Sequence, residues 1–265
     1  MIFNFHKYHG TGNDFIVGDN RSGIWNQLSV TQRAQLCHRR FGIGADGILL
    51  LGNAEKNEQV LFSMEYFNAD GRAGSFCGNG SRCLLAFASE LMDIPKNTYV
   101  SFKAYDGIHE GKINSDGRIS VMMKKGSEIK FHPEGMLLNT GSPHLVIRVE
   151  NVLETDVENQ GSLLRYAPEF RPDGLNVNFY QVCDDGSLFV RTYERGVEAE
   201  TLSCGTGVTA VALVHAATLT TPVKMVSIKT PGGMLSVELP SSMSGADSPV
   251  LNGPAVCVYS GSFSI

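Results

Sequence analysis

The 265-residue sequence predicts an α+β protein of two pseudo-symmetric halves, each a curved mixed β-sheet wrapped around a central buried helix. Three observations predict this fold class. A Cys-Gly-x-Gly turn occurs at 77–80 and again at 204–207, and close to half of the chain separates the two copies. Each turn precedes a helical segment with few charges on any face, which is typical of a buried helix. Strand-like segments lie on both sides of each helix, so a sheet would cover it.

In the first half, one further helix is expected besides the buried one. Residues 28–40 should form it, because Ser29 and Gln32 make a capping box at its start. The buried helix should follow Cys77 and extend to residue 92. A Ser-Asp-Gly turn at 115–117 predicts a hairpin. The segments expected to form strands are 2–8, 47–52, 60–68, 99–107 and 112–123.

The second half repeats the plan, with strands followed by a buried helix over 205–219. A hairpin is expected around Pro231-Gly232-Gly233. The expected strands are 144–150, 176–182, 188–194, both arms of 223–239, and 254–265. The polar segment 124–136 is the expected crossover between the halves. We therefore expect domains at 1–127, carrying Cys77, and 128–253, carrying Cys204, with strand 254–265 returning to the first.

The composition favours a soluble globular protein that acts on a small molecule. Hydrophobic residues make up 42% and charged residues 18% of the chain. The net charge is −5, with no long basic run, so nucleic acid is not expected as a partner. No segment resembles a signal peptide or a membrane span. We expect a cytoplasmic protein whose six cysteines are free thiols.

Both cysteines of the repeated turn stand where a helix is expected to begin. A helix start carries unpaired N–H groups and partial positive charge, so a thiol there should have a lowered pKa. A glycine-rich turn at this position also lets backbone N–H groups close around a carboxylate. A single buried cysteine before a helix is commonly structural. It is the matched pair that indicates function.

A pair of such sites from symmetric halves predicts inversion of a carbon centre. If the halves face each other, Cys77 and Cys204 would flank one ligand. A thiolate could remove a proton from one face of the carbon, and a thiol could return a proton to the other. The two helix starts would stabilise the carbanion formed beside a carboxylate.

No cofactor or metal is expected. Residues 42–47, GIGADG, fit the GxGxxG pattern, but they follow an expected helix and precede an expected strand. This order is the reverse of a dinucleotide-binding loop, so we expect a loop that supports the site. The cysteine spacings match no zinc motif.

Short motifs along nearly the whole chain resemble, in their order, those of the diaminopimelate epimerases. They are HGTGNDF at 9–15, FNADG at 67–71, CGNGSRC at 77–83, GSPH at 141–144, NVNF at 176–179, YERG at 193–196 and CGTG at 204–207. The resemblance implies the two-halved fold described above. It also implies interconversion of LL- and meso-2,6-diaminopimelate without pyridoxal phosphate or metal, in the supply of lysine and peptidoglycan precursors. A homodimer is the family precedent.

The resemblance assigns a role to each motif. Cys77 and Cys204 would be the acid–base pair. His144 and Glu194 would adjust the pKa values of the thiols. The substrate-binding residues would be Asn13, Asn68, Gly78, Asn79, Ser142, Asn176, Glu194, Arg195, Gly205 and Thr206. Cys83 is expected to be ordinary packing.

Three positions depart from the family pattern. Ser142 stands where asparagine is common, and we retain it as a binding residue. Gly47 stands where many members have glutamine, and it has no side chain to offer. One extra residue lies between Arg195 and Cys204, which should change the loop and leave the chemistry intact.

Other interpretations stay open. Taken singly, Arg195 beside Glu194 could be a surface pair, Asn13 a turn residue, and His144 a core histidine. The fold would also suit a proline racemase, a hydroxyproline epimerase or an isomerase of the phenazine-biosynthesis type. A non-catalytic thiol or redox-sensing binding protein is the alternative from another class.

Overall fold

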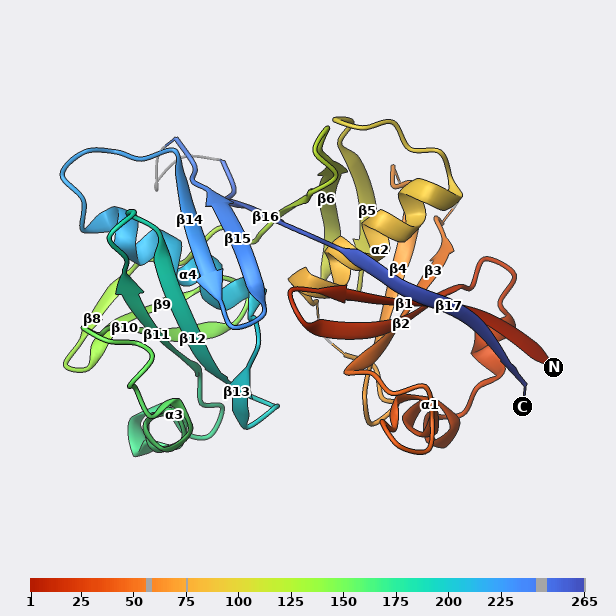
Figure 1. Cartoon of the computed structure of the whole chain (residues 1–265), viewed down its shortest axis with the longest axis horizontal. Coiled ribbons are helices and arrows are strands. Elements are labelled where there is room, and N and C mark those ends of the chain that lie inside the picture. The colour runs from red at the N-terminus through yellow and green to blue at the C-terminus, as the bar shows by residue number, and fades with distance from the viewer. Residues whose placement is uncertain (56–58, 75, 242–246, 265) are drawn as a thin grey trace. The chain divides into compact units, whose positions relative to one another are not determined.

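The computed structural model describes residues 1–55, 59–74, 76–241 and 247–264, and it divides the chain into two compact units (Figure 1). Unit 1 comprises Met1–Val121 and Gly253–Ile265, and unit 2 comprises Met122–Asn252. The division comes a few residues before the boundary expected from the sequence. Ile265, the last residue of the expected final strand, lies outside the described residues.

The sheet of unit 1 follows the order β17-β1-β2-β3-β4-β5-β6-β7. Two neighbouring pairs, β2–β3 and β4–β5, are parallel, and the other pairs are antiparallel. The strands are β1 Ile2–Gly10, β2 Asn13–Asp19, β3 Gly47–Asn53, β4 Phe62–Asn68, β5 Val100–Ala104, β6 Gly107–Ile113, β7 Ile119–Met122 and β17 Val256–Ser264.

A parallel pair needs a crossover connection, and in unit 1 each crossover contains a helix. Helix α1, Val30–Cys37, connects β2 to β3, after the short 3-10 helix η1, Ile24–Gln27. The predicted capping box is present, with Ser29 accepting from Gln32 N–H and the Gln32 side chain accepting from Ser29 N–H. Helix α2, Gly78–Leu91, connects β4 to β5 and packs against β1, β2, β3, β4 and β6.

Unit 2 has its own sheet with a matching order. From β9 the order is β9-β10-β11-β12-β14-β15-β16, and the parallel pairs are β10–β11 and β12–β14. Strand β8 extends the sheet beyond β9, and β13 also pairs with β12. The strands are β8 Lys130–His132, β9 Gly135–Asn139, β10 Pro143–Arg148, β11 Asn176–Val182, β12 Leu188–Glu194, β13 Ala199–Thr201, β14 Met225–Thr230, β15 Gly233–Glu238 and β16 Val250–Gly253.

The helices of unit 2 also occupy its crossovers. Helix α3, Val157–Arg165, and the 3-10 helix η2, Pro168–Phe170, connect β10 to β11. Helix α4, Gly205–Ala217, connects β12 to β14 and is buried almost throughout, as its uncharged sequence predicted. Its one polar side chain in the middle turn, Thr209, donates to Gly205 O at 2.8 Å, so the helix satisfies it internally.

The pairing order therefore confirms the predicted fold class of two pseudo-symmetric halves. β1 to β7 correspond in order to β9, β10, β11, β12, β14, β15 and β16, and α2 corresponds to α4. Figure 1 shows α2 in yellow and α4 in light blue, each among the strands of its own unit. In the part of the chain that the structure describes, no helix is long and apolar enough to cross a membrane.

This correspondence brings the predicted functional positions to the same end of the strands in each sheet. In unit 1, β2 starts at Asn13, β3 starts at Gly47, and β4 ends at Asn68, which pairs with Gly47. In unit 2, β10 starts at Pro143 and β11 starts at Asn176, with His144 paired to Asn176. β12 ends at Glu194. Because neighbouring strands lie side by side, the residues at these strand ends are close in space although they are far apart in the sequence.

Candidate active site

Cys77 is the N-cap residue of α2, and its half-buried thiol has both kinds of hydrogen-bond partner. Gly80 N–H donates to Sγ over 3.4 Å, and the thiol faces Asn13 Oδ1 at 3.7 Å. A thiolate can use the first contact and a thiol the second. The position therefore accommodates both protonation states, as an acid–base group requires.

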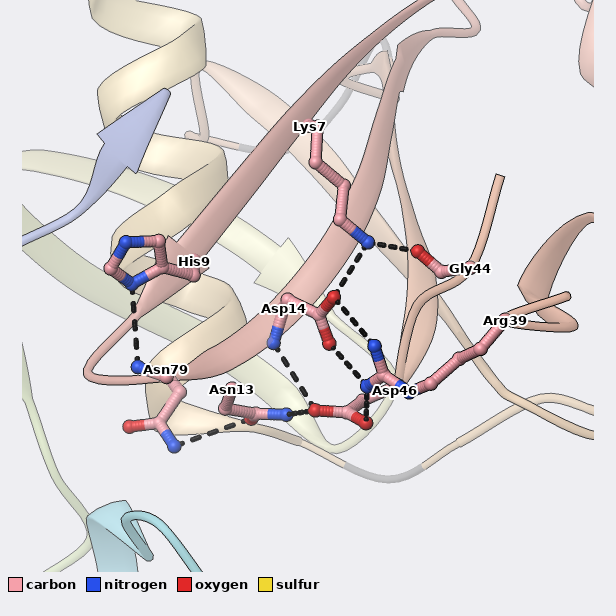
Figure 2. Close-up of polar contacts among 9 residues, drawn as sticks. Lys7, His9, Asn13, Asp14, Arg39, Gly44, Asp46 and Asn79 are labelled. Carbon is pink, nitrogen blue, oxygen red and sulfur yellow. Dashed lines mark hydrogen bonds and ion pairs between the residues drawn. The ribbon is translucent and has the colours of Figure 1, made fainter. Parts of the chain in front are cut away.

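Asn13 reaches Cys77 because a tight turn directs it there. Thr11 and Gly12 form the two-residue loop between β1 and β2, and both have positive φ, 52° and 86°. The Asn13 side chain then donates to Asp46 Oδ2 at 2.8 Å and accepts from Asn79 Nδ2 at 3.3 Å (Figure 2). The Asp46 contact fixes the amide so that its oxygen faces the cysteine.

A cluster of charges supports Asp46 and the start of β2. Arg39 donates to both Asp14 and Asp46 at 2.7 Å, and Asp14 N–H donates to Asp46 Oδ2 (Figure 2). Lys7, almost fully buried, pairs with Asp14 at 2.7 Å and donates to Gly44 O. Burial alone would raise the pKa of Asp14, but the bonds from Arg39 and Lys7 outweigh it and lower that pKa to about 2.

This cluster gives the GIGADG segment its role. Residues 42–47 follow α1 and lead into β3, as expected, and they supply Gly44 O and the Asp46 carboxylate to the cluster. The loop therefore supports the residues around Cys77. Asp46 itself was not among the predicted site residues, because carboxylates before strands are common in sequences.

Cys204 occupies the corresponding position in unit 2, as N-cap residue of α4. It is more buried than Cys77, with 5% of its surface exposed. Its Sγ lies 3.5 Å from Thr206 Oγ1. Thr140 donates to the Thr206 backbone oxygen at 2.9 Å, which ties the helix start to the loop between β9 and β10.

His144 lies in β10 and is fully buried, with Nδ1 3.1 Å from Asn178 Nδ2. Asn178 also donates to Leu145 O and accepts from the Thr192 hydroxyl, so its amide orientation is fixed. Burial, reinforced by the positive charge of Arg195, lowers the pKa of His144 to about 3. Its Nε2 is buried without a partner among the described residues.

Asn178 connects this histidine to the region of Cys204. A Cβ placed on Gly207 would collide with Asn178 Oδ1 and would lie 3.3 Å from Cys204 Sγ. Both groups therefore border the same glycine in the first turn of α4. The sequence prediction assigned only Asn176 within NVNF, and alternation along the strand is the signal that points Asn178 inward as well.

Ser142, Asn176 and Arg195 form a second polar cluster of unit 2. Asn176 donates to Ser142 Oγ at 2.9 Å and to Pro143 O, and its oxygen accepts from Arg195 N–H at 2.8 Å. The Arg195 guanidinium donates to Ser142 Oγ at 3.3 Å. Asn176 is thus bonded at both ends of its amide, which favours a role in holding Ser142 and Arg195 in place.

The remaining predicted residues are placed as follows. Glu194 ends β12 and accepts from the Thr201 hydroxyl at 2.9 Å. Asn68 is exposed at the end of β4, and its backbone N–H donates to Arg72 O in the following turn. Gly78 and Gly205 are buried first residues of their helices. Cys83 is fully buried, as predicted for a packing residue, and burial raises its pKa far above its usual value.

A cavity of about 510 Å³ opens in unit 2 beside Pro143 and His144. Asp173 and Gly174, whose backbone oxygens accept from the Arg195 guanidinium at 3.5 Å, also line it. Within the described residues, no group of three or more His, Cys, Asp and Glu side chains could hold a metal ion.

A sequence model of the family described as diaminopimelate epimerase matches residues 5–129 and 136–258. The chain belongs to the diaminopimelate epimerase family. This family was inferred above from the ordered motifs, and the match confirms it.

Curated relatives share this family name. A diaminopimelate epimerase from Flavobacterium psychrophilum is 46% identical over 213 residues, covering 80% of this chain and 81% of the relative. One from Chlorobaculum tepidum is 41% identical over 210 residues, covering 77% and 80%. One from Aquifex aeolicus is 38% identical over 230 residues, covering 79% and 80%.

Solved structures with little sequence identity share the fold. A phenazine biosynthesis protein of the PhzF family from Bacillus anthracis has a TM-score of 0.77 at 14% identity and full coverage of both chains. A hydroxyproline epimerase from Agrobacterium vitis has a TM-score of 0.67 at 18% identity, covering 98% of this chain and 92% of that one.

Two departures from the diaminopimelate epimerase pattern have structural explanations. A Cβ at Gly47 would lie 2.5 Å from Phe67 O and 2.6 Å from the Tyr66 ring, so this chain has no room for a side chain there. Ser142, in place of the common asparagine, is bonded to both Asn176 and Arg195. It therefore belongs to the polar cluster of unit 2 despite its shorter side chain.

Proposed function

We propose that this member of the diaminopimelate epimerase family interconverts LL- and meso-2,6-diaminopimelate without a cofactor, using Cys77 and Cys204 as two acid–base groups. The reaction would supply lysine and peptidoglycan precursors in the cytoplasm. The observation that carries the proposal is the matched position of the two thiols. Cys77 is the N-cap residue of α2, the helix in the crossover after β4, and Cys204 is the N-cap residue of α4, the helix in the crossover after β12. The chain belongs to a family named for epimerisation.

The proton balance requires both thiols. In one direction, one thiolate removes the α-proton and becomes a thiol, while the other thiol gives its proton to the opposite face and becomes a thiolate. The enzyme then holds the reverse protonation pattern, which is the form ready for the opposite reaction. The contacts of Cys77 to Gly80 N–H and to Asn13 Oδ1 support this exchange of roles, because each protonation state has a partner.

The carboxylate at the reacting carbon would bind at the starts of α2 and α4. The N–H groups of Gly78, Asn79, Gly205 and Thr206 belong to the first turns of these helices, where backbone N–H groups lack intrahelical partners. The same N–H groups would stabilise the negative charge that develops when the α-proton leaves. Stabilisation of this carbanion is the main catalytic role that we assign to the backbone.

The distal end of the substrate is a zwitterion and needs both signs of charge. Arg195 would form a fork to its carboxylate, and Ser142 would donate to it, both held in place by Asn176. Glu194 would accept from an ammonium group, with Asn13 and Asn68 bonding further polar groups. We assign His144 to the surroundings of Cys204, which it reaches through Asn178.

Exchange of the α-proton with solvent tests the proposal. LL-diaminopimelate incubated with the enzyme in D₂O should gain deuterium at the α-carbon and yield the meso isomer. L-proline and trans-4-hydroxy-L-proline should gain none. Turnover of proline with no turnover of diaminopimelate would identify a proline racemase. Absence of label from every substrate would favour the non-catalytic thiol protein.

A further inference from the structure

Arg82 is a buried cation that bonds to no carboxylate among the described residues. The side chain has 0% exposure and lies in α2, one turn beyond the helix start at Cys77. Its guanidinium donates to Asn79 Oδ1 at 3.0 Å, Thr11 Oγ1 at 3.2 Å and Pro254 O at 3.3 Å. Nη1 has no partner among the described residues. Burial of an unpaired charge costs free energy, so the presence of an arginine at this position requires an explanation.

The bonds of Arg82 begin a series of side-chain hydrogen bonds in which the orientation of every amide is determined. Arg82 donates to Asn79 Oδ1, Asn79 Nδ2 donates to Asn13 Oδ1, and Asn13 Nδ2 donates to Asp46 Oδ2. Figure 2 shows the last two of these links. The series has a cation at one end and an anion at the other, so its hydrogen bonds all run in one direction. Neither amide can rotate without losing bonds.

We propose that Arg82 and Asp46 are positioning residues for Cys77, with opposite effects on its thiolate form. Through Asn79 and Asn13, the two ends hold an amide oxygen against the thiol, and their opposite charges act on it in opposite directions: the negative charge of Asp46 favours the protonated form. The buried charge of Arg82 favours the thiolate. Neither residue is assigned to contact substrate. The proposal rests on the proposed function only in taking Cys77 as an acid–base group.

Cys83 and Cys77 are the two groups whose negative charge would act on Arg82, and only one of them is able to ionise. Cys83 is fully buried and stays neutral, because burial raises its pKa. Cys77 is half-buried at the helix start. Burial lowers the pKa of Arg82 to about 10, and the negative charges that Cys83 and Cys77 would carry partly offset this lowering. Arg82 is therefore still a cation at neutral pH.

Other ionisable groups act on the same region and must be held constant in a test. They are His9 on β1, Asp14 on β2 with its partners Lys7 and Arg39, Cys83 on α2, and Arg118 before β7. None of them is substituted in the variants below, and Arg39 keeps its pairing with Asp14 when Asp46→Asn removes the charge of its second partner.

The test is the pH dependence of Cys77 alkylation by iodoacetamide in the reduced full-length protein, without substrate. Peptide mass spectrometry separates Cys77 from the other cysteines. We expect Arg82→Gln to move the midpoint up by about one pH unit, the effect of losing a nearby opposite charge. We expect Asp46→Asn to move it down, because an anion is lost and Asn13 can turn its NH₂ towards the sulfur. Arg21→Gln, which removes an exposed positive charge paired with Asp19, should leave it unchanged.

Opposite shifts are the signature, because a general loss of structure would not move the two midpoints in opposite directions. An unchanged midpoint in Arg82→Gln, or shifts of the same sign in both variants, would overturn the proposal. If Arg82→Gln does not fold, Asp46→Asn decides alone: a lower midpoint supports the proposal and any other result refutes it. Because no turnover is measured, the result is independent of whether the epimerase assignment holds.

Discussion

The side-chain amide of Asn178 donates to Nδ1 of His144, 3.1 Å away. The direction of this bond is fixed, because Asn178 Nδ2 also donates to the Leu145 carbonyl oxygen at 3.2 Å, so the NH₂ end of the amide faces His144. His144 Nδ1 must therefore be the acceptor, and the single proton of the neutral ring is on Nε2. His144 consequently presents a buried N–H donor, not a positive charge.

The protonation state of His144 is directly testable by NMR of the ¹⁵N-labelled protein. Burial lowers its pKa to about 3. We expect no titration of this ring between about pH 5 and 8, and nitrogen shifts of the Nε2–H tautomer throughout. Asn178→Asp supplies the contrast, because a carboxylate beside Nδ1 should raise the pKa. Titration of His144 in the unchanged protein near its ordinary value would contradict the assignment.

The same group makes stability depend on pH with a definite sign. The folded pKa of His144, about 3, lies below its ordinary value of 6.5, so the unfolded chain binds the proton more readily. This contribution to stability is complete above the ordinary value and is lost as pH falls towards the folded pKa. We expect His144→Gln to reduce the slope of unfolding free energy against pH in this window, by at most about 1.4 kcal/mol per pH unit. An identical slope in urea titrations of both proteins would refute this.

Gly207 tests the contact between Asn178 and the start of α4. A Cβ there would collide with Asn178 Oδ1 and crowd Cys204 Sγ at 3.3 Å. We expect Gly207→Ala to lower the free energy of unfolding by about 1–3 kcal/mol, although alanine is the better helix former. Gly80→Ala is the matched control, because its Cβ would meet only the end of the Leu49 side chain, at 3.1 Å, which is a milder contact than the collision at Gly207. Equal losses in urea titrations would show that the Asn178 contact is not decisive.

Asn176 is expected to matter more than Ser142, because it holds both Ser142 and Arg195. Asn176→Ala should lower kcat/KM by about 10- to 100-fold, since it removes the hydrogen bonds to Ser142 Oγ, Pro143 O and the Arg195 backbone N–H, each worth about 0.5–1.5 kcal/mol. Ser142→Ala should have a smaller effect, mainly on KM. Ser187→Ala, in the exposed turn before β12, is the control. A larger loss from Ser142→Ala than from Asn176→Ala would reverse the order of roles.

The fold was largely predictable because its signals are local and repeated. Two uncharged helices after matching cysteine turns indicated buried helices, and the capping box at Ser29 marked the start of α1. Helix α3 and strands β2, β8, β9, β13 and β16 were not predicted. Helix α3 is short and has several exposed positions, so its apolar pattern is weak; β2 begins within a motif that was interpreted only for its chemistry.

The site was predictable only as far as the motifs reach. The cysteines and their neighbours could be named from spacing, but Asp46, Asn178 and Arg82 could not be given roles. Each acts through other side chains, and at least one of the links joins residues far apart in the sequence, as with Asn79 and Asn13. Such pairs depend on strand register and helix packing, which a single sequence specifies only through the complete fold.

The two cysteines themselves provide the most direct test of mechanism. Cys77→Ala and Cys204→Ala should each abolish inversion, with a loss of at least about 100-fold in kcat, because one thiol cannot serve both faces of the α-carbon. Polarimetry or coupled assay of meso-diaminopimelate measures it. Cys257→Ala and Cys183→Ala, at thiols outside both helix starts, should retain activity. Near-normal epimerisation by either Cys77→Ala or Cys204→Ala would exclude the two-base mechanism, whereas loss of activity in the control variants would indicate that thiol removal acts through stability.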